Sequence, residues 1–373
     1  MPVVLHWFLP TTGDSRSIVG VDDRGGRSTH TDGAALREPD IEYLIDVARA
    51  AERTGFTGVL TPTGTWCEDA WLTTAAIARE TSTLKFLVAF RPGSLSPTLA
   101  AQMAATFQRI SRGRLMLNIV TGSDAAEQQR FGDWLGKDER YARTGEFLTV
   151  LRGAWTGPFD FKGEHFHVAG ALAPRRFDAP PIYFGGSSAA ALRVATDHAE
   201  VYLTWGEPPA AVAGKIAALR DLGYTGRFGI RLHVITRDTA KQAWAEADAL
   251  LDALTPDQIA KAQASLRQAD SVGQQRMLAL HSAFQSDGSR EALEIYPNLW
   301  AGVGLVRPGA GTALVGSHTE VADRIAEYHD LGIDEFILSG YPHLEEAYHA
   351  GEGLLPELRR RGLLGSSTGE TDK

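Results

Sequence analysis

Short apolar runs alternate with longer amphipathic segments along this chain, and this alternation limits its possible folds more than any other feature. Eight runs rich in Val, Ile, Leu and Phe have the composition of strands buried on both faces. They span residues 3–9, 57–62, 84–90, 114–120, 181–186, 201–205, 227–235 and 334–340. Segments with helical periodicity lie at 40–54, 70–81, 97–111, 139–154, 188–198, 208–222, 240–253, 318–331 and 344–361. Eight such units predict an α/β fold, a closed (β/α)8 TIM barrel more than an open doubly wound sheet.

Two stretches are additional to the strand–helix units of a minimal barrel, and we interpret both as insertions. Residues 155–180 contain FDFKGEHFHV, which predicts a hairpin with Gly163 in its turn. Residues 254–316 are polar and helical before a glycine-rich end. We expect residues 1–363 to form a single barrel domain with these two insertions, and residues 364–373 to be a disordered tail.

The charge balance argues against polyanionic partners. The chain has a formal net charge of -9, from 37 basic and 46 acidic residues, without a block of lysines or arginines. Neither nucleic acid nor an anionic membrane is therefore expected as a partner. Cys67 is the single cysteine, so no internal disulfide can form, and neither a signal peptide nor a membrane-spanning apolar run is evident. We expect a cytoplasmic protein.

Polar side chains gather where the predicted strands end. Barrel enzymes build their active sites from residues at the C-terminal ends of the strands, so these side chains are candidates for a site. The set comprises Cys67, Arg91, Asn118, Thr121, Asp124, Gly185 to Ser188, Trp205, Glu207, Arg231, His233, Tyr341 and His343.

The run YFGGSSAAA ends the fifth predicted strand, crosses two glycines and enters a helix. Backbone N–H groups and Ser hydroxyls in the first turn of a helix bind phosphate well. Gly185, Gly186, Ser187 and Ser188 are therefore candidates for holding a phosphate. The same residue types are common in ordinary turns and helix N-caps, so both interpretations stay open.

Arg231 and His233 are two residues apart in the seventh predicted strand, so both side chains point to one face, toward the lumen or its mouth. A charge there needs a partner. It is either an acidic side chain in a structural ion pair or a bound anion, because a guanidinium group matches sulfonate or phosphate oxygens. His165 and His167 are expected on one face of a hairpin strand, but a third ligand is not evident and no metal site is predicted.

Cys67 lies in PTGTWCEDAW, between a strand and the acidic start of a helix, where a thiolate can be stabilised. Its sequence neighbours include no Lys, Arg or His that would support a nucleophile. We interpret Cys67 as part of a pocket wall that touches a cofactor or a peroxide, with inert packing as the alternative.

Ten stretches between residues 7 and 348 closely resemble the two-component alkanesulfonate monooxygenases of the bacterial-luciferase-like flavin group. They are WFLPTTGD, CEDAW, LKFLVAFRPG, LNIVTGSD, PPIYFGGSS, YLTWGEPP, RFGIRLHVITRD, DSVGQQRM, PNLWAGVGLVRPGAGTALVG and LSGYPHLEEAY. The resemblance implies a TIM barrel of that group. It further implies that a separate NAD(P)H-dependent reductase supplies reduced FMN, that O2 forms a peroxyflavin, and that an organosulfonate is converted to an aldehyde and sulfite. The family also suggests a homo-oligomer, a dimer or tetramer.

The resemblance assigns three sets of residues. The catalytic positions match Cys67, Trp205, Arg231, His233, Arg307 and Tyr341. The flavin contacts match Ala89, Asn118, Thr121, Tyr141, Gly186, Ser187 and Ser188, and Gly185 joins them through the phosphate-binding pattern. The expected substrate contacts are Trp205, Arg231, His233, Tyr341 and His343.

These residue types suit the chemistry that the resemblance implies. Arg231 and Arg307 can hold the sulfonate or stabilise the peroxyflavin anion, and the Trp205 indole N–H is a directed donor. His233 and Tyr341 are candidates for proton transfer, with His233 expected to titrate closest to neutral pH. The glycine-rich residues 302–313 are expected to be a mobile lid that delivers Arg307.

Two departures bear on the substrate. Thr65 stands where the family commonly has Arg, and the polar segment 11–39 after the first strand is longer than in relatives. Both favour a bulkier or more polar sulfonate, such as sulfoquinovose, over a simple alkanesulfonate. The alternatives are an F420- or flavin-dependent oxidoreductase acting on a non-sulfonate substrate and a non-catalytic flavin-binding protein.

Overall fold

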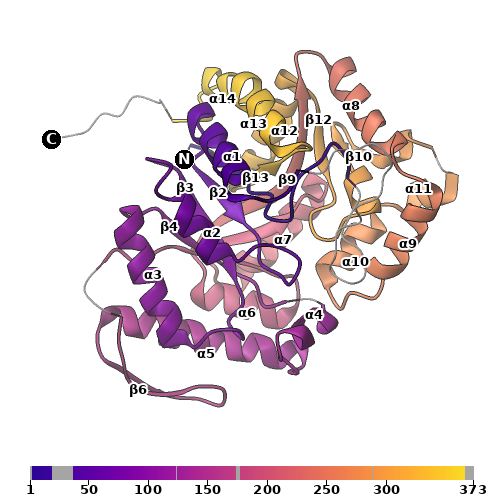
Figure 1. Cartoon of the computed structure of the whole chain (residues 1–373). Coiled ribbons are helices and arrows are strands. Elements are labelled where there is room, and N and C mark those ends of the chain that lie inside the picture. Colours follow the sequence, from indigo (N-terminus) through magenta and orange to yellow (C-terminus); the bar gives the residue numbers. More distant parts are fainter. Residues whose placement is uncertain (1, 19–36, 123, 174–176, 288, 366–373) are drawn as a thin grey trace.

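The computed structural model describes residues 2–18, 37–122, 124–173, 177–287 and 289–365. Eight parallel strands form a closed barrel in which the last strand pairs with the first (Figure 1). In spatial order they are β1 (Val4–Phe8), β2 (Gly58–Thr61), β3 (Lys85–Phe90), β4 (Leu115–Ile119), β7 (Ile182–Gly185), β8 (Val201–Trp205), β9 (Arg227–Arg237) and β13 (Ile333–Ser339). The predicted TIM barrel is confirmed, and each barrel strand falls on a predicted apolar run.

Helices cover the outside of the barrel. They are α1 (Ile41–Thr54), α2 (Ala70–Ile77), α3 (Pro97–Ser111), α5 (Lys137–Thr156), α6 (Ala189–His198), α7 (Pro209–Asp221), α8 (Ala240–Asp252), α12 (His318–Asp330), α13 (His343–His349) and α14 (Leu355–Arg360), with a π-helical turn at Ala350–Leu354. Asp40, Ser96 and Ser317 are among the side chains that cap these helices by accepting a backbone N–H. A short helix that the sequence pattern does not predict, α4 (Ala125–Arg130), is capped by Asp124.

The segment between α8 and α12 contains more strand than its composition predicts. Its helices are α9 (Pro256–Leu266), α10 (Val272–Ala279) and α11 (Ser282–Asp287), and its strands are β10 (Glu294–Tyr296), β11 (Leu299–Trp300) and β12 (Ala313–Ser317). β9 extends to residue 237, past the predicted end at 235, and β12 pairs in parallel with its residues 233 to 237. β8 reaches only residue 231 of β9, so β12 takes the edge that β8 leaves. The segment therefore builds one wall above the barrel.

The hairpin predicted within 155–180 is present as β5 (Phe159–Lys162) and β6 (His167–Ala171), and Gly163 lies in its turn. His165 lies in the turn as well, so the expectation that His165 and His167 share one strand face is wrong. Among the described residues, no group of three or more His, Cys, Asp or Glu side chains is arranged to hold a metal ion. None of the described helices is long and apolar enough to cross a membrane. Residues 19–36 of the polar loop and 366–373 of the expected tail lie outside the described residues.

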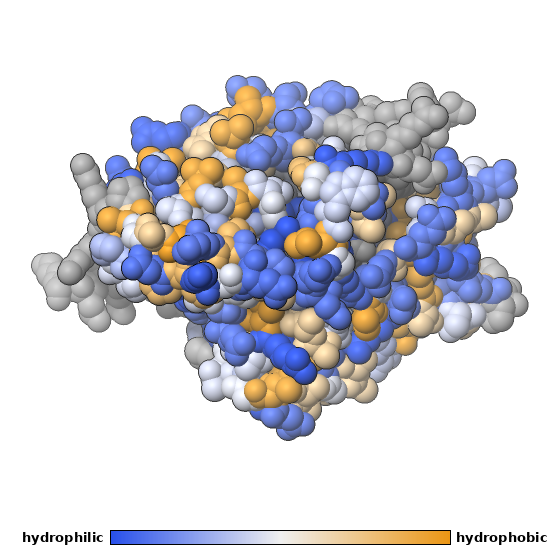
Figure 2. Space-filling model, turned by 90° about the horizontal axis from the view of Figure 1, so that it is seen from below, coloured by the Kyte–Doolittle hydropathy of each residue, from blue (hydrophilic) through white to orange (hydrophobic). Residues whose placement is uncertain are grey.

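The outer surface is a mosaic of polar and apolar side chains, as the face in Figure 2 shows. Large exposed apolar side chains include Leu72 on α2 and Trp134 before α5, each 76% exposed. The main apolar core lies between the strands and the helices, whereas Leu60, Leu87, Met116 and Tyr183 belong to a smaller cluster with Ile337.

Glu335 on β13 holds a buried polar cluster. Its carboxylate accepts hydrogen bonds from His6 (3.0 Å) and Tyr183 (2.7 Å) and forms an ion pair with Arg227. Burial acts to raise the pKa of Glu335, but the hydrogen bond and charge of His6, with Arg227 and Tyr183, outweigh it and lower the pKa. The ionised carboxylate is thus compensated by partners from three other strands.

Removing this carboxylate should destabilise the barrel. We expect Glu335→Ala to lower the free energy of unfolding by roughly 3–5 kcal/mol, because it leaves buried partners without an anion. Since the folded-state pKa of Glu335 is lowered, its contribution is present above about pH 4 and should be lost as the pH falls further. Urea unfolding at several pH values measures both effects. Glu80→Ala, which breaks the exposed Arg49 pair (2.6 Å), is the control and should cost only about 0–1 kcal/mol.

Candidate active site

The C-terminal mouth of the barrel contains a cation without an acidic partner. Arg231 on β9 donates to the carbonyls of Leu232 (2.5 Å) and Ile337 (3.4 Å) and to Ser339 Oγ (2.7 Å), and its guanidinium stacks 4.7 Å from the Phe8 ring centroid. None of these described contacts is a carboxylate. Burial, with the nearby positive charge of Arg307, lowers the pKa of Arg231 to about 10 although Tyr341 opposes the shift, so the group stays charged at neutral pH. An unpaired cation in this position favours the anion-site interpretation over a structural ion pair.

His233 lies two residues further along β9 and is locked in one tautomer. Its Nε2 contacts the carbonyl of Ala310 (3.1 Å), and its Nδ1 contacts Ser339 Oγ (2.7 Å). Because a carbonyl only accepts, Nε2 carries the hydrogen and Nδ1 accepts from Ser339, which itself accepts from Arg231. Burial and the charges of Arg231 and Arg307 place the pKa of His233 well below its ordinary value. The expectation that His233 titrates closest to neutral pH is therefore wrong.

Arg307 and Tyr341 meet above His233. The Arg307 guanidinium lies 4.7 Å from the Tyr341 ring centroid, and the Tyr341 ring stacks on His233 at 5.3 Å. Arg307 Nε donates to the Ile18 carbonyl (3.2 Å). Burial raises the pKa of the Tyr341 phenol, opposed by the two arginines, so it is a proton donor at neutral pH. Three of the predicted catalytic side chains are thus in contact before any ligand binds.

The segment that carries Arg307 is packed and does not have the contacts of an open lid. Gly304 donates to the Gly311 carbonyl (2.8 Å), and Gln263 donates to the carbonyls of Gly304 (3.1 Å) and Leu305 (2.8 Å). A Cβ added to Gly311 would lie 2.6 Å from the Gly304 Cα. These glycines allow close packing, whereas the sequence interpretation assigned them to backbone freedom.

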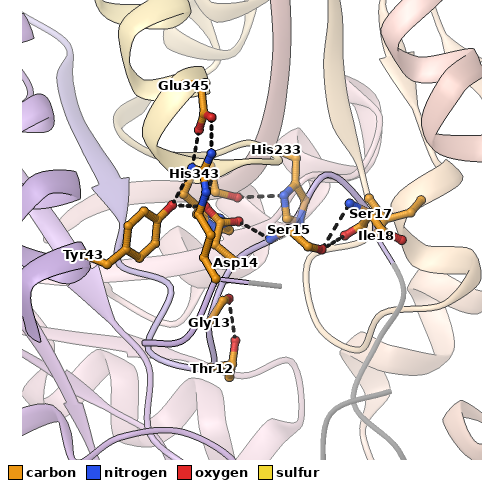
Figure 3. Close-up of polar contacts among 12 residues, drawn as sticks. Thr12, Gly13, Asp14, Ser15, Ser17, Ile18, Tyr43, His233, His343 and Glu345 are labelled. Atoms are coloured by element: carbon orange, nitrogen blue, oxygen red, sulfur yellow. Dashed lines mark hydrogen bonds and ion pairs between the residues drawn. The ribbon is translucent and has the colours of Figure 1, made fainter. Parts of the chain in front are cut away.

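An acidic network that the sequence interpretation missed lies beside Tyr341. Asp14, which follows β1, accepts hydrogen bonds from the His343 ring (Nδ1, 2.9 Å) and backbone N–H (2.6 Å) and from the Tyr43 hydroxyl (Figure 3). Arg37 pairs with Glu345 at the start of α13. The signal that could have found Asp14 is its position directly after a barrel strand, within WFLPTTGD.

The turn from β7 into α6 is closely packed around Gly186. Gly186 has φ +144°, and a Cβ there would lie 2.7 Å from the Ala191 Cβ and 3.0 Å from the Tyr141 hydroxyl. Ser188 caps α6, and the Tyr202 hydroxyl donates to the Gly186 carbonyl (2.7 Å). The expected flavin contact Tyr141 and the expected phosphate contacts Gly185 to Ser188 therefore lie close together.

A cavity of about 500 Å³ adjoins this turn on the side of α7 and α10. Ser187 and Tyr202 line it together with the buried Lys215–Glu207 ion pair (2.7 Å) and the exposed Arg276. Glu207, a strand-end residue of the predicted set, therefore has an ionic partner in Lys215.

The remaining expected flavin contacts lie on β3, on β4 and just after β4. Ala89 and Asn118 are paired in register on these strands, and the buried Thr121 Oγ1 has no hydrogen-bond partner among the described atoms. Arg91 pairs with Glu127 (2.6 Å). Its Nε and Nη1 are buried and have no hydrogen-bond partner among the described atoms. Orphaned buried polar atoms at this mouth are what a polar ligand would satisfy.

Cys67 and Trp205 lie on the rim. Cys67 Sγ contacts the carbonyls of Pro62 (3.8 Å) and Gly64 (3.6 Å), and burial raises the pKa of its thiol to about 12. The position therefore does not stabilise a thiolate, as the lack of a Lys, Arg or His beside it in the sequence suggested. The Trp205 ring lies next to Gly273 of α10, where an added Cβ would approach it to 2.9 Å.

A closed parallel barrel with arginine, histidine, tyrosine and tryptophan side chains at its C-terminal mouth defines a TIM-barrel enzyme. The luciferase-like monooxygenase model matches residues 6–335, and the chain belongs to this family of flavin-dependent monooxygenases.

Several solved structures share the fold of this chain. A riboflavin lyase with modified FMN and riboflavin aligns over 98% of this chain and 93% of its own, with 18% identity and a TM-score of 0.78. An EDTA monooxygenase from Chelativorans sp. BNC1 covers 100% and 97%, with 18% identity and a TM-score of 0.76. DmoA from Hyphomicrobium sulfonivorans covers 98% and 90%, with 19% identity and a TM-score of 0.75. At such identities these likenesses show the fold alone.

The packing around Arg307 leads to a prediction about dynamics. Backbone amides of residues 304–307 should exchange hydrogen slowly in the ligand-free protein, since Gly304 and Arg307 donate to backbone carbonyls of buried residues. Gly311→Ala should speed this exchange because its Cβ would collide with Gly304. Hydrogen exchange with mass spectrometry, with and without flavin and sulfonate, measures both. If these amides exchange fast in the free protein and ligands slow the exchange, the segment is a mobile lid, as the sequence analysis predicted.

Proposed function

We propose that this protein is a reduced-FMN- and O2-dependent monooxygenase that converts an organosulfonate to an aldehyde and sulfite. The observation that carries the proposal is Arg231, a charged guanidinium at the barrel mouth whose described partners are two carbonyls and one hydroxyl. A cation desolvated to this degree is stabilised by an anion, and three sulfonate oxygens suit a guanidinium fork.

The neighbouring side chains suit the rest of such a substrate. Arg307 adds a second positive charge, and the Trp205 indole and the Tyr341 phenol are donors that can face an oxygen atom. The reaction takes a sulfonate, O2 and reduced flavin to an aldehyde, bisulfite, water and oxidised flavin. One oxygen atom enters the carbonyl and the other leaves as water. His233, with both nitrogens occupied, holds Ser339 and through it orients Arg231.

The residues present fit FMN. The Gly186 turn, the N-terminus of α6 and the Tyr141 hydroxyl would hold its phosphate, while Ala89, Asn118 and Thr121 would contact the ring system. When bound and reduced, the flavin supplies two electrons and activates O2. A separate NAD(P)H-dependent reductase would deliver it. We also propose a homo-oligomeric, cytoplasmic enzyme that contains a single barrel domain.

The identity of the anion is open to direct measurement. The EDTA monooxygenase is named for a polycarboxylate, so a sulfonate and a carboxylate are separate arms of one assay. The purified protein, with a flavin reductase, NADH and FMN, is given octanesulfonate, sulfoquinovose or EDTA. We expect sulfite from a sulfonate, and more from the polar sulfoquinovose, because Thr65 accepts a hydrogen bond from Arg130 (3.4 Å) and leaves a polar rim. Turnover of EDTA without sulfite from any sulfonate would refute the proposal.

The Arg231→Ala variant should fold normally and release sulfite much more slowly than the wild type. A charge-assisted hydrogen bond to an anion is worth about 1.5–3 kcal/mol, so kcat/KM for the sulfonate should fall roughly 10- to 150-fold. Arg231→Lys should fall less, since it keeps the charge and loses the fork. Arg237→Lys on the same strand, whose partner is Glu346 (2.6 Å), is the control for altered charge geometry on β9. Unchanged turnover of Arg231→Ala at saturating flavin would rule out this substrate site.

FMN should bind roughly 10- to 100-fold more tightly than riboflavin, because the β7–α6 turn has no anion to contact in riboflavin. Gly186→Ala should weaken FMN binding, since its Cβ would meet Ala191 and Tyr141. Gly157→Ala, where an added Cβ meets nothing within 4 Å, is the matched control. Fluorescence titration measures all four affinities, and equal affinity for the two flavins would place the phosphate elsewhere.

A further inference from the structure

The two histidines of the site differ in what their ring nitrogens can still do. Both nitrogens of His233 are occupied, Nε2 by the Ala310 carbonyl and Nδ1 by Ser339. The positive charges of Arg231 and Arg307 further oppose its protonation. His233 therefore has no lone pair free to accept a proton from a substrate.

His343 has the complementary arrangement. Its Nδ1 lies 2.9 Å from Asp14 Oδ1, and its backbone N–H donates to Asp14 Oδ2 at 2.6 Å. An ionised carboxylate only accepts, so Nδ1 carries a hydrogen, and in the neutral ring Nε2 holds the lone pair. Nε2 has no hydrogen-bond partner among the described residues, although the side chain as a whole is only 5% exposed.

Asp14 is held firmly enough to fix that tautomer. Its side chain is fully buried and accepts further hydrogen bonds from the Tyr43 hydroxyl and the Ser15 N–H (2.9 Å). Its backbone pairs in both directions with Arg37 (2.9 and 2.7 Å), which is joined to Glu345 on α13. Burial acts to raise the pKa of Asp14, but the charge and hydrogen bonds of His343, with Tyr43, lower it. The carboxylate is thus ionised and immobile.

The surroundings of His343 place it at the reaction space. Its ring meets the Tyr341 ring edge-on at 5.1 Å, and Phe8 of β1 packs on it at 5.7 Å. Asp14 is the anion that contacts it directly. On the other side of Tyr341 lie the neutral His233 and the cations Arg231 and Arg307, the groups expected to hold the sulfonate.

We propose that Asp14 and His343 form the proton-transfer pair of this site, with His343 Nε2 as the acceptor and Asp14 as its positioning residue. The proposal rests on the proposed function. The carbon that bears the sulfonate must lose one hydrogen as a proton when it becomes a carbonyl carbon. Sulfite leaves with the electron pair of the C–S bond as one oxygen atom of O2, brought to the peroxide level by the two electrons of the reduced flavin, bonds to that carbon. The electron pair of the C–H bond then forms the second C–O bond while the O–O bond breaks, Nε2 takes the proton, and the other oxygen atom leaves as water. The competing interpretation is a structural anchor that ties the segment after β1 to α13.

The first test is the tautomer, which does not depend on activity. Proton–nitrogen correlation spectra of protein labelled with 15N-histidine should show His343, assigned by its loss in His343→Gln, with hydrogen on Nδ1. Asp14→Ala should let it revert to the Nε2–H form. The Nε2–H form in the wild type, or an unchanged tautomer in Asp14→Ala, would overturn the proposal.

The second test is the pH profile of sulfite release. A base must be unprotonated, so the rate should fall on the acid side, and His343→Gln should lose roughly 10²- to 10⁴-fold activity together with that acid limb. Asp14→Asn should lose roughly 10- to 100-fold activity, because the ring loses the carboxylate that orients it. An acid limb that survives in His343→Gln would overturn the proposal.

Glu345→Gln and Tyr43→Phe are the matched controls, since they loosen the same anchor without touching His343. Both should keep the wild-type limb. If both controls lose the acid limb, Asp14 and His343 act as a structural anchor, and the proton-transfer proposal is overturned. Failure of the proposed function looks different, because wild-type protein would then release no sulfite from any sulfonate while the tautomer remains measurable.

Discussion

The pairing of β13 with β1 closes the barrel, and the site depends on that closure. In a closed parallel barrel all strand ends meet on one ring, so side chains far apart in sequence become neighbours. β13 lies in register with β9 on its other side, which sets Ile337 beside Arg231 and Ser339 beside His233. The contact of Ser339 with both side chains follows from this register. Beneath them, Glu335 ties the same strand to three others.

Tyr341 lies between the positive and the negative side chains of the barrel mouth. Arg231 and Arg307 lie on one side, where they keep His233 neutral, and the ionised Asp14 lies on the other, where it contacts His343. An anionic group and a proton acceptor need opposite electrostatic surroundings, because a cation holds the first and opposes protonation of the second. Both kinds of surroundings are thus present at one barrel mouth.

Sequence reasoning succeeded where a local pattern is decisive. Each barrel strand is an apolar run buried on both faces, so its position can be read without knowing its neighbours. Spacing also placed Arg231 and His233 on one face, and the glycine-serine run marked the β7–α6 turn. The strands of the segment before α12 were missed because they are only two to five residues long, too short for a clear alternation pattern. The sequence interpretation took Gly304 and Gly311 as sites of backbone flexibility. In the structure the two glycines pack against each other, where a side chain would not fit.

By itself, the sequence determined the barrel, the order of its strands and the residue types that reach its mouth, because hydrophobic periodicity and strand-end position are local properties. Only the tertiary structure decided which of those residues are partnered. Arg91 and Glu207 have ionic partners, while Arg231 is surrounded by neutral acceptors. The tertiary structure also decided the protonation states of Cys67 and His233, since burial keeps the first a thiol and the second neutral. A side chain's charge and tautomer depend on desolvation and on neighbours brought from distant strands, and neither is written in the residues beside it.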